Sequence, residues 1–200
     1  MERVSRSGVR GKKNRILKLY NRAPAKSHVV CFDEFGPMEL RPIGGVSWAR
    51  KRHPQRHRAT YTRKAGTEQL LAFYDVHGDI LEGVIHKRKT SHDILQAWQR
   101  LRACYPRSHR IYLILDNLSS HWRKDLRRFA RKNRISLVPT PTYASWLNLI
   151  EAQFTALKRF CLSNSDDPTH LVRRQRIYRF LTLRNRHADP GSQLRIYRRY

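Results

Sequence analysis

The stretch that decides the fold is RIYLILDNLSSHW, residues 110–122. Its residues 111–115 are apolar on both faces of a strand, since alternate side chains point to opposite sides. A short strand of this kind is typical of the middle of a sheet that helices cover on both sides. The apolar run ends abruptly at Asp116, where polar residues begin. The segment therefore predicts a buried α/β strand that delivers a carboxylate to one edge of the sheet.

Two further acidic residues follow from the same reasoning. The β-branched run HVVCFD, residues 28–33, is a second predicted buried strand, and it ends in Asp33. Glu151 lies at the margin of the apolar stripe of a predicted helix over 145–161. Each acid alone is explained by an ordinary cap or surface role. Together they predict a cluster at the carboxyl edge of the sheet, where Mg²⁺ would relieve their mutual repulsion.

The rest of the chain predicts a mixed sheet. Residues 68–87 form a hairpin, and residues 135–139 form a last short strand. Helical spacing of apolar residues predicts helices over 91–101, 122–132, 145–161 and 169–184. An antiparallel three-stranded start followed by two parallel strands, with helices on both sides, is the expected α/β architecture.

Composition indicates a nucleic-acid partner. The 200 residues hold 42 Lys and Arg against 15 Asp and Glu, a net charge of +27, with a pI of about 11.2. No acidic residue occurs between Leu40 and Thr67, where Trp48 and Tyr61 interleave the cations. The predicted DNA-contacting residues are these cations and those on the helix beginning near Trp122: Arg50, Lys51, Arg52, Arg56, Arg58, Arg63, Lys64, Lys124, Arg127, Arg128 and Arg131.

Length, cysteine spacing and the lengths of the apolar stretches indicate how the chain is organised. The length suits one main domain, over 28–190, with a basic arm or linker over 1–27 and a basic tail over 191–200. Three widely spaced cysteines favour neither a disulfide framework nor a zinc ribbon. No stretch resembles a membrane span or a signal peptide, which indicates a protein of the cytoplasm.

Two longer motifs carry a family resemblance. LILDNLSSH (113–121) and PTYASWLNLIEAQF (141–154) resemble the second and third signatures of DDE transposases, with thirty-four residues between Asp116 and Glu151. VVCFDEFG (29–36) is similar to the first signature, and LRNRHADP (183–190) to the usual C-terminal segment that contains Asn. The resemblance is nearest to the bacterial insertion-sequence branch of the mariner superfamily and covers about residues 28–190.

The resemblance implies a ribonuclease-H-like fold in which Asp33, Asp116 and Glu151 bind two Mg²⁺ or Mn²⁺ ions. In this family, water first cleaves the transposon ends, and the freed 3′ hydroxyl then attacks target DNA. The implied partner is double-stranded DNA, held by a homodimer associated with the bacterial nucleoid. Four residues would support the site: Asn117 and His121 beside Asp116, and Asn148 and Trp146, which set the approach of the Glu151 helix. Trp146 is equally compatible with a place in the core.

One departure from the family leaves alternatives open. Family members carry an N-terminal helix-turn-helix module, for which this chain has only a short basic leader, so the module would be encoded separately or lost. A host nuclease of the same fold would need a fourth acid, for which Glu34 and Asp75 are candidates, although alternation places Glu34 away from the face of Asp33. A third reading is a DNA-binding remnant without catalytic activity.

Overall fold

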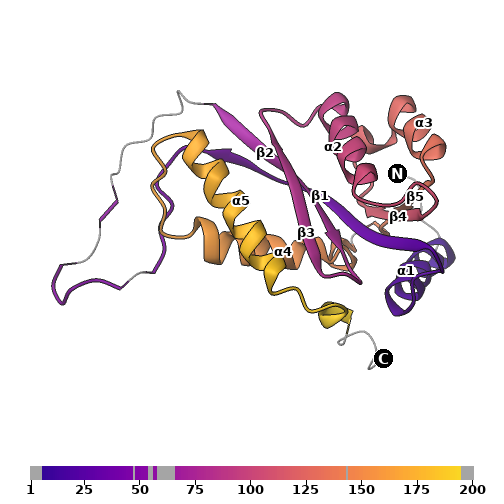
Figure 1. Ribbon diagram of the computed structural model, residues 1–200, viewed down its shortest axis with the longest axis horizontal. Helices are drawn as coiled ribbons and strands as arrows, with labels where there is room; N and C mark the ends of the chain where they lie inside the picture. Colours follow the sequence, from indigo (N-terminus) through magenta and orange to yellow (C-terminus); the bar gives the residue numbers. More distant parts are fainter. Residues whose placement is uncertain (1–5, 47, 54–55, 58–65, 143, 195–200) are drawn as a thin grey trace.

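A computed structural model of the chain describes residues 6–46, 48–53, 56–57, 66–142 and 144–194. Its centre is a five-stranded sheet with the strand order β3-β2-β1-β4-β5 (Figure 1). The antiparallel strands are β1 (Ser27–Glu39), β2 (Thr67–Asp75) and β3 (Ile80–His86). Strands β4 (Arg110–Leu115) and β5 (Ile135–Pro139) run parallel to β1. The predicted mixed sheet, antiparallel first and then parallel, is confirmed.

Helices cover both faces of the sheet. One face packs against α2 (Ser91–Ala103) and α3 (Lys124–Lys132). The other face packs against α1 (Arg6–Asn21), α4 (Ile150–Leu157) and α5 (His170–Arg186). Short helices link these layers, namely η2 (Ser119–Trp122), η3 (Ser145–Leu147), the π-helical turn η4 (Lys158–Leu162) and η5 (Ser192–Leu194). Two separate apolar cores result, one on each side of the sheet.

Strand β4 belongs to both cores. Ile111, Leu113 and Leu115 are fully buried under α2 and α3. Ile114 is fully buried on the opposite face, and Tyr112 packs beside it. Each aliphatic side chain buried in this way stabilises the fold by about 1.5–3 kcal/mol, so the strand end at Asp116 is held rigidly.

The N-terminal region corrects one expectation. The structure contains the helix α1, whereas the charge and glycines of residues 1–27 predicted an irregular basic arm or linker. Ile16 and Tyr20 are fully buried, and Leu19 nearly so. The Tyr20 hydroxyl donates a hydrogen bond of 2.5 Å to the Leu147 carbonyl oxygen. The apolar spacing of three and four residues in RILKLY was the overlooked signal, because the surrounding charge hid a stripe that the sheet covers.

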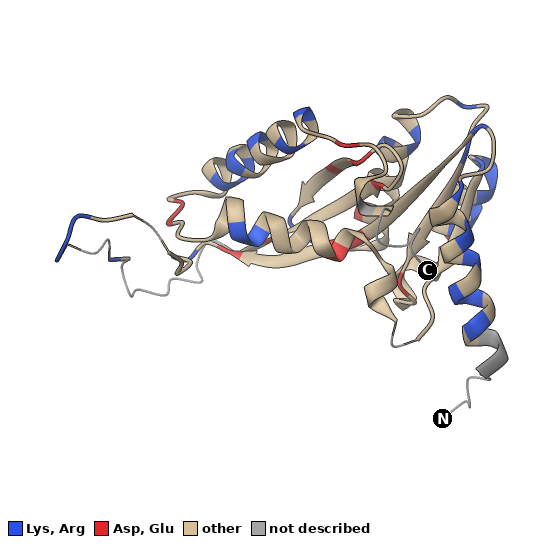
Figure 2. Cartoon of the chain, turned by 90° about the horizontal axis from the view of Figure 1, so that it is seen from below, with Lys and Arg blue, Asp and Glu red and all other residues tan. Residues whose placement is uncertain are grey.

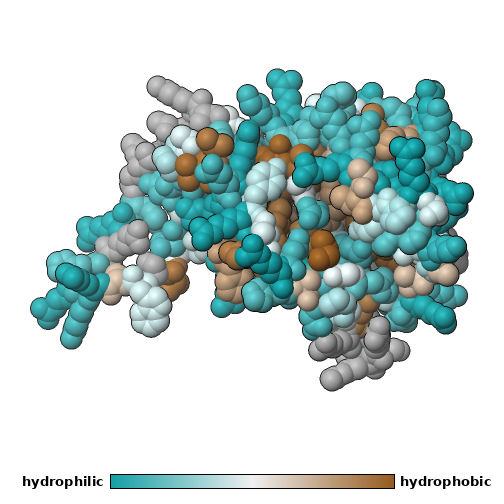
Figure 3. Space-filling model, in the orientation of Figure 1, coloured by the Kyte–Doolittle hydropathy of each residue, from teal (hydrophilic) through white to brown (hydrophobic). Residues whose placement is uncertain are grey.

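The surface is largely hydrophilic. On the face in Figure 3, apolar side chains gather in the middle, over the region where α4 and α5 lie in Figure 1. The described part of the loop between β1 and β2 extends away from the sheet, at the left of Figure 1. Within the described residues, no helix has the length and apolar character needed to cross a membrane.

Candidate active site

The parallel pairing of β1 and β4 brings two of the acids together. Cys31 pairs with Ile114, the last pair in the register. Continuing this register by two residues places Asp33 level with Asp116, on strands about 4.8 Å apart. Asp116 directly follows the end of β4, as predicted, but Asp33 does not end its strand, because β1 continues to Glu39 through its pairing with β2. Asp33 lies just beyond the last pair between β1 and β4, so both acids are still at the carboxyl edge of the parallel part of the sheet.

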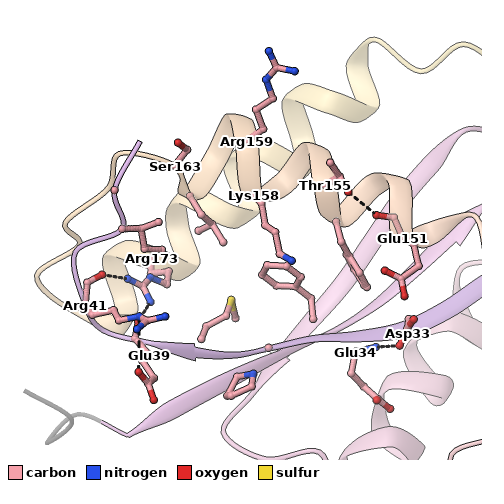
Figure 4. Close-up of a pocket in the computed structure, with 18 residues that line it drawn as sticks. Asp33, Glu34, Glu39, Arg41, Glu151, Thr155, Lys158, Arg159, Ser163 and Arg173 are labelled. Carbon is pink, nitrogen blue, oxygen red and sulfur yellow. Dashed lines mark hydrogen bonds and ion pairs between the residues drawn. The ribbon is translucent and has the colours of Figure 1, made fainter. Parts of the chain in front are cut away.

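Glu151 reaches the same edge from α4. The helix is anchored on β1 through Ile150, which is fully buried, and through a contact between the Phe154 and Phe35 rings at 5.2 Å. The Glu151 backbone N–H donates to the Asn148 carbonyl oxygen at 3.1 Å, which starts the helix. In Figure 4, the Glu151 carboxylate points toward Asp33. The three acids therefore converge from β1, β4 and α4.

The pKa of Asp33 is strongly shifted in the folded chain. Burial raises the pKa of Asp33 to about 7, and the negative charges of Glu151 and Asp116 add to the effect. Two donors hold its carboxylate: the Glu34 backbone N–H at 2.7 Å and the Asn148 side-chain amide at 3.3 Å. An ionised Asp33 is thus costly in this position unless a cation lies beside it.

A buried histidine links Asp116 to a fourth acid. His121 has no exposed surface, and its Nε2 lies 2.6 Å from Oε1 of Glu34. Its Nδ1 lies 2.9 Å from Oδ1 of Asp116 in an ion pair, although the N–H does not point along this line. Burial disfavours a charged imidazole, but the two carboxylates outweigh it and raise the pKa of His121 to about 9. The adjacent His121 in turn lowers the pKa of Asp116.

Glu34 and Asp75 do not join the acid cluster. Glu34 faces the opposite side of the sheet from Asp33, where it contacts His121 and lies 3.8 Å from the Lys89 ammonium. Asp75 ends β2 opposite Val30, three residues before Asp33 on β1, and accepts a hydrogen bond from the Tyr105 hydroxyl at 2.9 Å. The contact between Glu34 and His121 was not predicted, because it joins residues 87 positions apart.

Three other residues were predicted to support the site, namely Asn117, Asn148 and Trp146. Asn117 donates to the Thr140 carbonyl oxygen at 2.8 Å and so ties the end of β4 to the end of β5. Asn148 is buried and also donates to the Phe32 carbonyl oxygen at 3.1 Å, which links the start of α4 to β1. Trp146 is 57% exposed, with the Lys13 ammonium 5.7 Å from its ring centroid. The alternative that placed Trp146 in the core is therefore wrong.

A groove of mixed charge adjoins the acids. A cavity of about 780 Å³ lies between β1 and the helices α4 and η4, with Asp33 and Glu151 at one end. Lys158 and Arg159 line it further along. In Figure 4 the Lys158 side chain points into the cavity, whereas the Arg159 guanidinium points away from it. The Lys158 ammonium lies 5.5 Å from the centroid of the Phe35 ring. Lys158 was missed in the sequence, although its spacing of seven residues from Glu151 is two helical turns and puts both on one face.

The predicted DNA-contacting cations lie in two distant places. Arg50, Lys51, Arg52 and Arg56 are exposed on the loop between β1 and β2. Lys124, Arg127, Arg128 and Arg131 are exposed on α3, at the other end of the molecule (Figure 1). The structure does not bring these two sets together. Arg58, Arg63 and Lys64 lie outside the described residues, as does most of the predicted basic tail over 191–200.

The donor set suits a hard divalent cation in its chemistry. All three acids offer carboxylate oxygens, and Asp33 is buried enough to need a compensating charge. Within the described ranges, no group of three or more His, Cys, Asp and Glu side chains lies close enough together to hold one ion. The Asp116 side chain is 42% exposed, and Glu151 is exposed as well, so a cation can approach both carboxylates from solvent.

Comparison with known proteins agrees with this geometry. The family model described as DDE superfamily endonuclease matches residues 28–170. A search of curated proteins finds none with significant sequence similarity to the chain.

Three solved structures show the same fold. The Mos1 strand transfer complex superposes with a TM-score of 0.64 at 17% identity, covering 99% of this chain and 59% of that one. The Mos1 mariner paired end complex with Mg gives a TM-score of 0.66 at 15% identity, covering 98% and 60%. The catalytic domain of Mos1 mariner transposase gives 0.57 at 16%, covering 99% and 90%.

The chain thus spans about three fifths of the length of the transposase chains in those complexes and nearly the whole length of the isolated catalytic domain. The superpositions confirm the predicted ribonuclease-H-like fold. Because the family model covers most of the sequence and includes all three converging acids, the chain belongs to the DDE superfamily of endonucleases.

Proposed function

We propose that this chain is the catalytic domain of a transposase that cleaves and joins DNA with the help of divalent metal ions. The observation that carries the proposal is the convergence of Asp33, Asp116 and Glu151 at one sheet edge, beside a groove that continues into Lys158 and Arg159. The structural relatives support it, since they include a Mos1 strand transfer complex and Mos1 paired end complexes with Mg and with Mn.

The residues of the site would have three distinct roles: to bind metal ions, to position the metal-binding carboxylates and to contact phosphates. Asp33, Asp116 and Glu151 would hold two Mg²⁺ or Mn²⁺ ions, which activate the attacking oxygen and stabilise the leaving one. Asn148 holds the Asp33 carboxylate in place, and His121 does the same for Asp116. Lys158 offers positive charge to the phosphates of a strand that enters the groove.

The proposed reaction has two steps, and each step forms one phosphorus–oxygen bond and breaks another. In the first, a water oxygen bonds to the scissile phosphorus, the bond to the 3′ oxygen breaks, and the water proton ends on the released 3′ hydroxyl. In the second, that hydroxyl bonds to a phosphorus of target DNA and releases another 3′ hydroxyl. One phosphodiester replaces another in the second step, so no nucleotide cofactor is needed.

Several finer points belong to the same proposal. The partner is double-stranded DNA, and a homodimer would hold two transposon ends. Recognition of those ends would come from a helix-turn-helix module on another polypeptide. The source would be a bacterial insertion sequence, with the protein acting at the nucleoid. The predicted contacts of the loop cations and of the α3 cations with DNA stay predictions.

A nicking and joining assay tests the proposal. The chain is incubated with supercoiled plasmid and a labelled duplex carrying a free 3′ hydroxyl, in Mg²⁺ or Mn²⁺. Asp116→Asn should lower nicking and joining at least about 100-fold, because even partners of metal ligands typically contribute 10- to 100-fold. Asp125→Asn is the matched control, since Asp125 is an exposed acid on α3 whose ion-pair partner is Arg123.

The outcomes separate the candidate functions. Joining of the labelled strand in the wild type, lost in Asp116→Asn, supports a transposase. Metal-dependent nicking without joining would instead favour a host nuclease of the same fold. Equal activity in wild type and Asp116→Asn would overturn the catalytic assignment and leave a DNA-binding remnant.

A further inference from the structure

A second groove lies at the open edge of the sheet, away from the acids. Strand β5 is an edge strand, with α1 on one side and α3 on the other. Between them is a groove of about 490 Å³. Five arginines and one tryptophan line it: Arg15 from α1, Arg110 from the start of β4, Trp122, Arg127 and Arg131 from η2 and α3, and Arg134 from the turn before β5.

The charges in this groove are not neutralised. No carboxylate lines it, and none of the five arginines forms an ion pair with a carboxylate within the described part of the chain. Arg110 donates to the Ser136 hydroxyl at 2.9 Å, and Arg134 makes a long contact of 3.5 Å with the Ser108 carbonyl oxygen. All five guanidinium groups belong to exposed residues. Their convergence is unfavourable unless a polyanion occupies the groove.

Arginines with a structural role look different in this protein. Arg173 is buried and paired with Asp167, and Arg184 is paired with Asp79. Each of those guanidinium groups closes a contact between elements of the fold. The arginines of the β5 groove come instead from α1, β4, α3 and the turn before β5, and none of them is paired with a carboxylate of the described residues. Figure 2 shows Lys and Arg repeated along α1, the helix next to the N-terminus, which forms one wall.

The groove is also placed to meet DNA that occupies the active site. β4 runs from Arg110 at the groove to Leu115, and Asp116 follows. At about 3.3 Å per residue, six residues separate the groove from the acids by about 20 Å. This distance equals about six base pairs of a duplex at 3.4 Å per base pair.

We propose that the β5 groove binds the phosphate backbone of duplex DNA outside the cleavage site, through Arg15, Arg110, Arg127, Arg131 and Arg134. This inference rests on the proposed function for its ligand, because DNA is the polyanion that the active site would process. It assigns separate roles to the cations of α3. Arg127 and Arg131 face the groove, whereas Lys124 and Arg128 on the same helix do not line it. Trp122 supplies an apolar wall against which a sugar can pack.

The test compares two double variants on one helix. Binding of a labelled duplex of about 30 base pairs is measured by fluorescence anisotropy in EDTA, between about 50 and 200 mM salt. Arg127→Gln with Arg131→Gln should raise Kd at least about tenfold and make the slope of log K against log salt shallower by about 1.8, or 0.9 for each lost phosphate contact. Lys124 and Arg128 were also predicted to contact DNA, but they lie outside the groove. Lys124→Gln with Arg128→Gln removes the same charge and should therefore change the slope by less than half as much.

Further variants keep the result interpretable. Arg127→Lys with Arg131→Lys keeps the charge and should restore the slope. Sedimentation and thermal unfolding of each variant show whether the arginines instead keep the β5 edge from self-association. Equal losses in the groove pair and the control pair would overturn the proposal, since net charge alone would then explain binding. So would variants that weaken binding of an RNA duplex while leaving DNA binding unchanged.

Experiments can overturn DNA binding by the β5 groove without overturning the proposed catalytic function, and the reverse. Binding in EDTA needs no catalysis, so a groove that binds DNA in a chain that never nicks it would leave this inference standing. Nicking that disappears in Asp116→Asn, with unchanged binding by the groove variants, would overturn the groove and leave the active site standing.

Discussion

At the scale of single residues, the arrangement around His121 is the least expected feature of the site. A fully buried imidazole lies between the carboxylates of Glu34 and Asp116, which come from different strands. Its raised pKa keeps His121 positively charged near neutral pH. The imidazolium therefore compensates the negative charge of Asp116 from the buried side, and the exposed side of that carboxylate stays open to solvent. Glu34 in turn holds the ring, and so acts on Asp116 only through His121.

Glu34→Gln should therefore weaken the binding of the catalytic metal ions more than it lowers the stability of the fold. Loss of the charged partner leaves His121 with one carboxylate, and Asp116 is then held less firmly. We expect the Mg²⁺ concentration needed for half-maximal nicking to rise about 10- to 100-fold, the range typical of groups that orient metal ligands. A metal titration of the nicking rate measures this. Glu82→Gln, at an exposed position on β3, is the control; a variant with the wild-type titration would show that Glu34 has no positioning role.

Asp33 gives a dependence of stability on pH. Its pKa in the folded chain, about 7, is above the ordinary value of 3.8 because of burial and the nearby Glu151 and Asp116. The folded state therefore binds this proton more tightly, and the stability it contributes is present below about pH 4 and lost as pH rises through about 7. In EDTA, Asp33→Asn should be more stable than wild type at about pH 8 and should differ less at about pH 5.

Urea unfolding at the two pH values measures the effect. Mg²⁺ should stabilise the wild type more at the higher pH, because the ion must replace the proton on Asp33. Equal stabilisation by Mg²⁺ at both values, or an Asp33→Asn variant that is less stable at the higher pH, would contradict the prediction.

At the scale of elements, α1 is part of the folded domain. Its buried residues pack into the same core as α4, and Tyr20 reaches the backbone of Leu147, just before Asn148 and the Glu151 helix. The helix thus supports the segment that positions the third acid. This contact joins residues 127 positions apart.

Ile16→Ala should destabilise the chain by about 2–5 kcal/mol, the usual cost of such a truncation in a packed core. Lys12→Ala on the exposed side of the same helix should change stability by less than about 0.5 kcal/mol. Chemical denaturation compares the two. Near-equal stability of both variants would show that α1 is not packed on the sheet.

At the scale of the whole molecule, positive charge is spread over two ends. The loop that carries Arg50, Lys51 and Arg52 extends from one end, and the β5 groove lies at the other (Figure 1). A net charge of +27 makes DNA binding strongly dependent on salt in any case. The separation of the two surfaces predicts that their contributions to binding are independent.

Charge reversal of Arg50, Lys51 and Arg52 should weaken duplex binding and flatten its salt dependence. Combined with the Arg127→Gln and Arg131→Gln pair, the losses in binding free energy should add to within about 0.5 kcal/mol, as expected for distant sites. Anisotropy titrations of the single and combined variants test this. An unchanged salt slope after charge reversal would exclude the loop as a phosphate contact, and strong coupling would mean that the two surfaces are not independent.

What the sequence alone determined is the mixed sheet and the position of two acids just after apolar runs. Those runs predicted the parts of β1 and β4 that pair in parallel, so Asp33 and Asp116 could be placed beside each other without coordinates, whereas the extension of β1 beyond Asp33 to Glu39 follows from its pairing with β2. Only the tertiary structure decided the burial of α1, the chain of contacts from Glu34 through His121 to Asp116, and the gathering of five arginines at β5. Strand and helix periods are local properties of the chain, whereas these contacts depend on the packing of elements far apart in the sequence, which the local pattern does not specify.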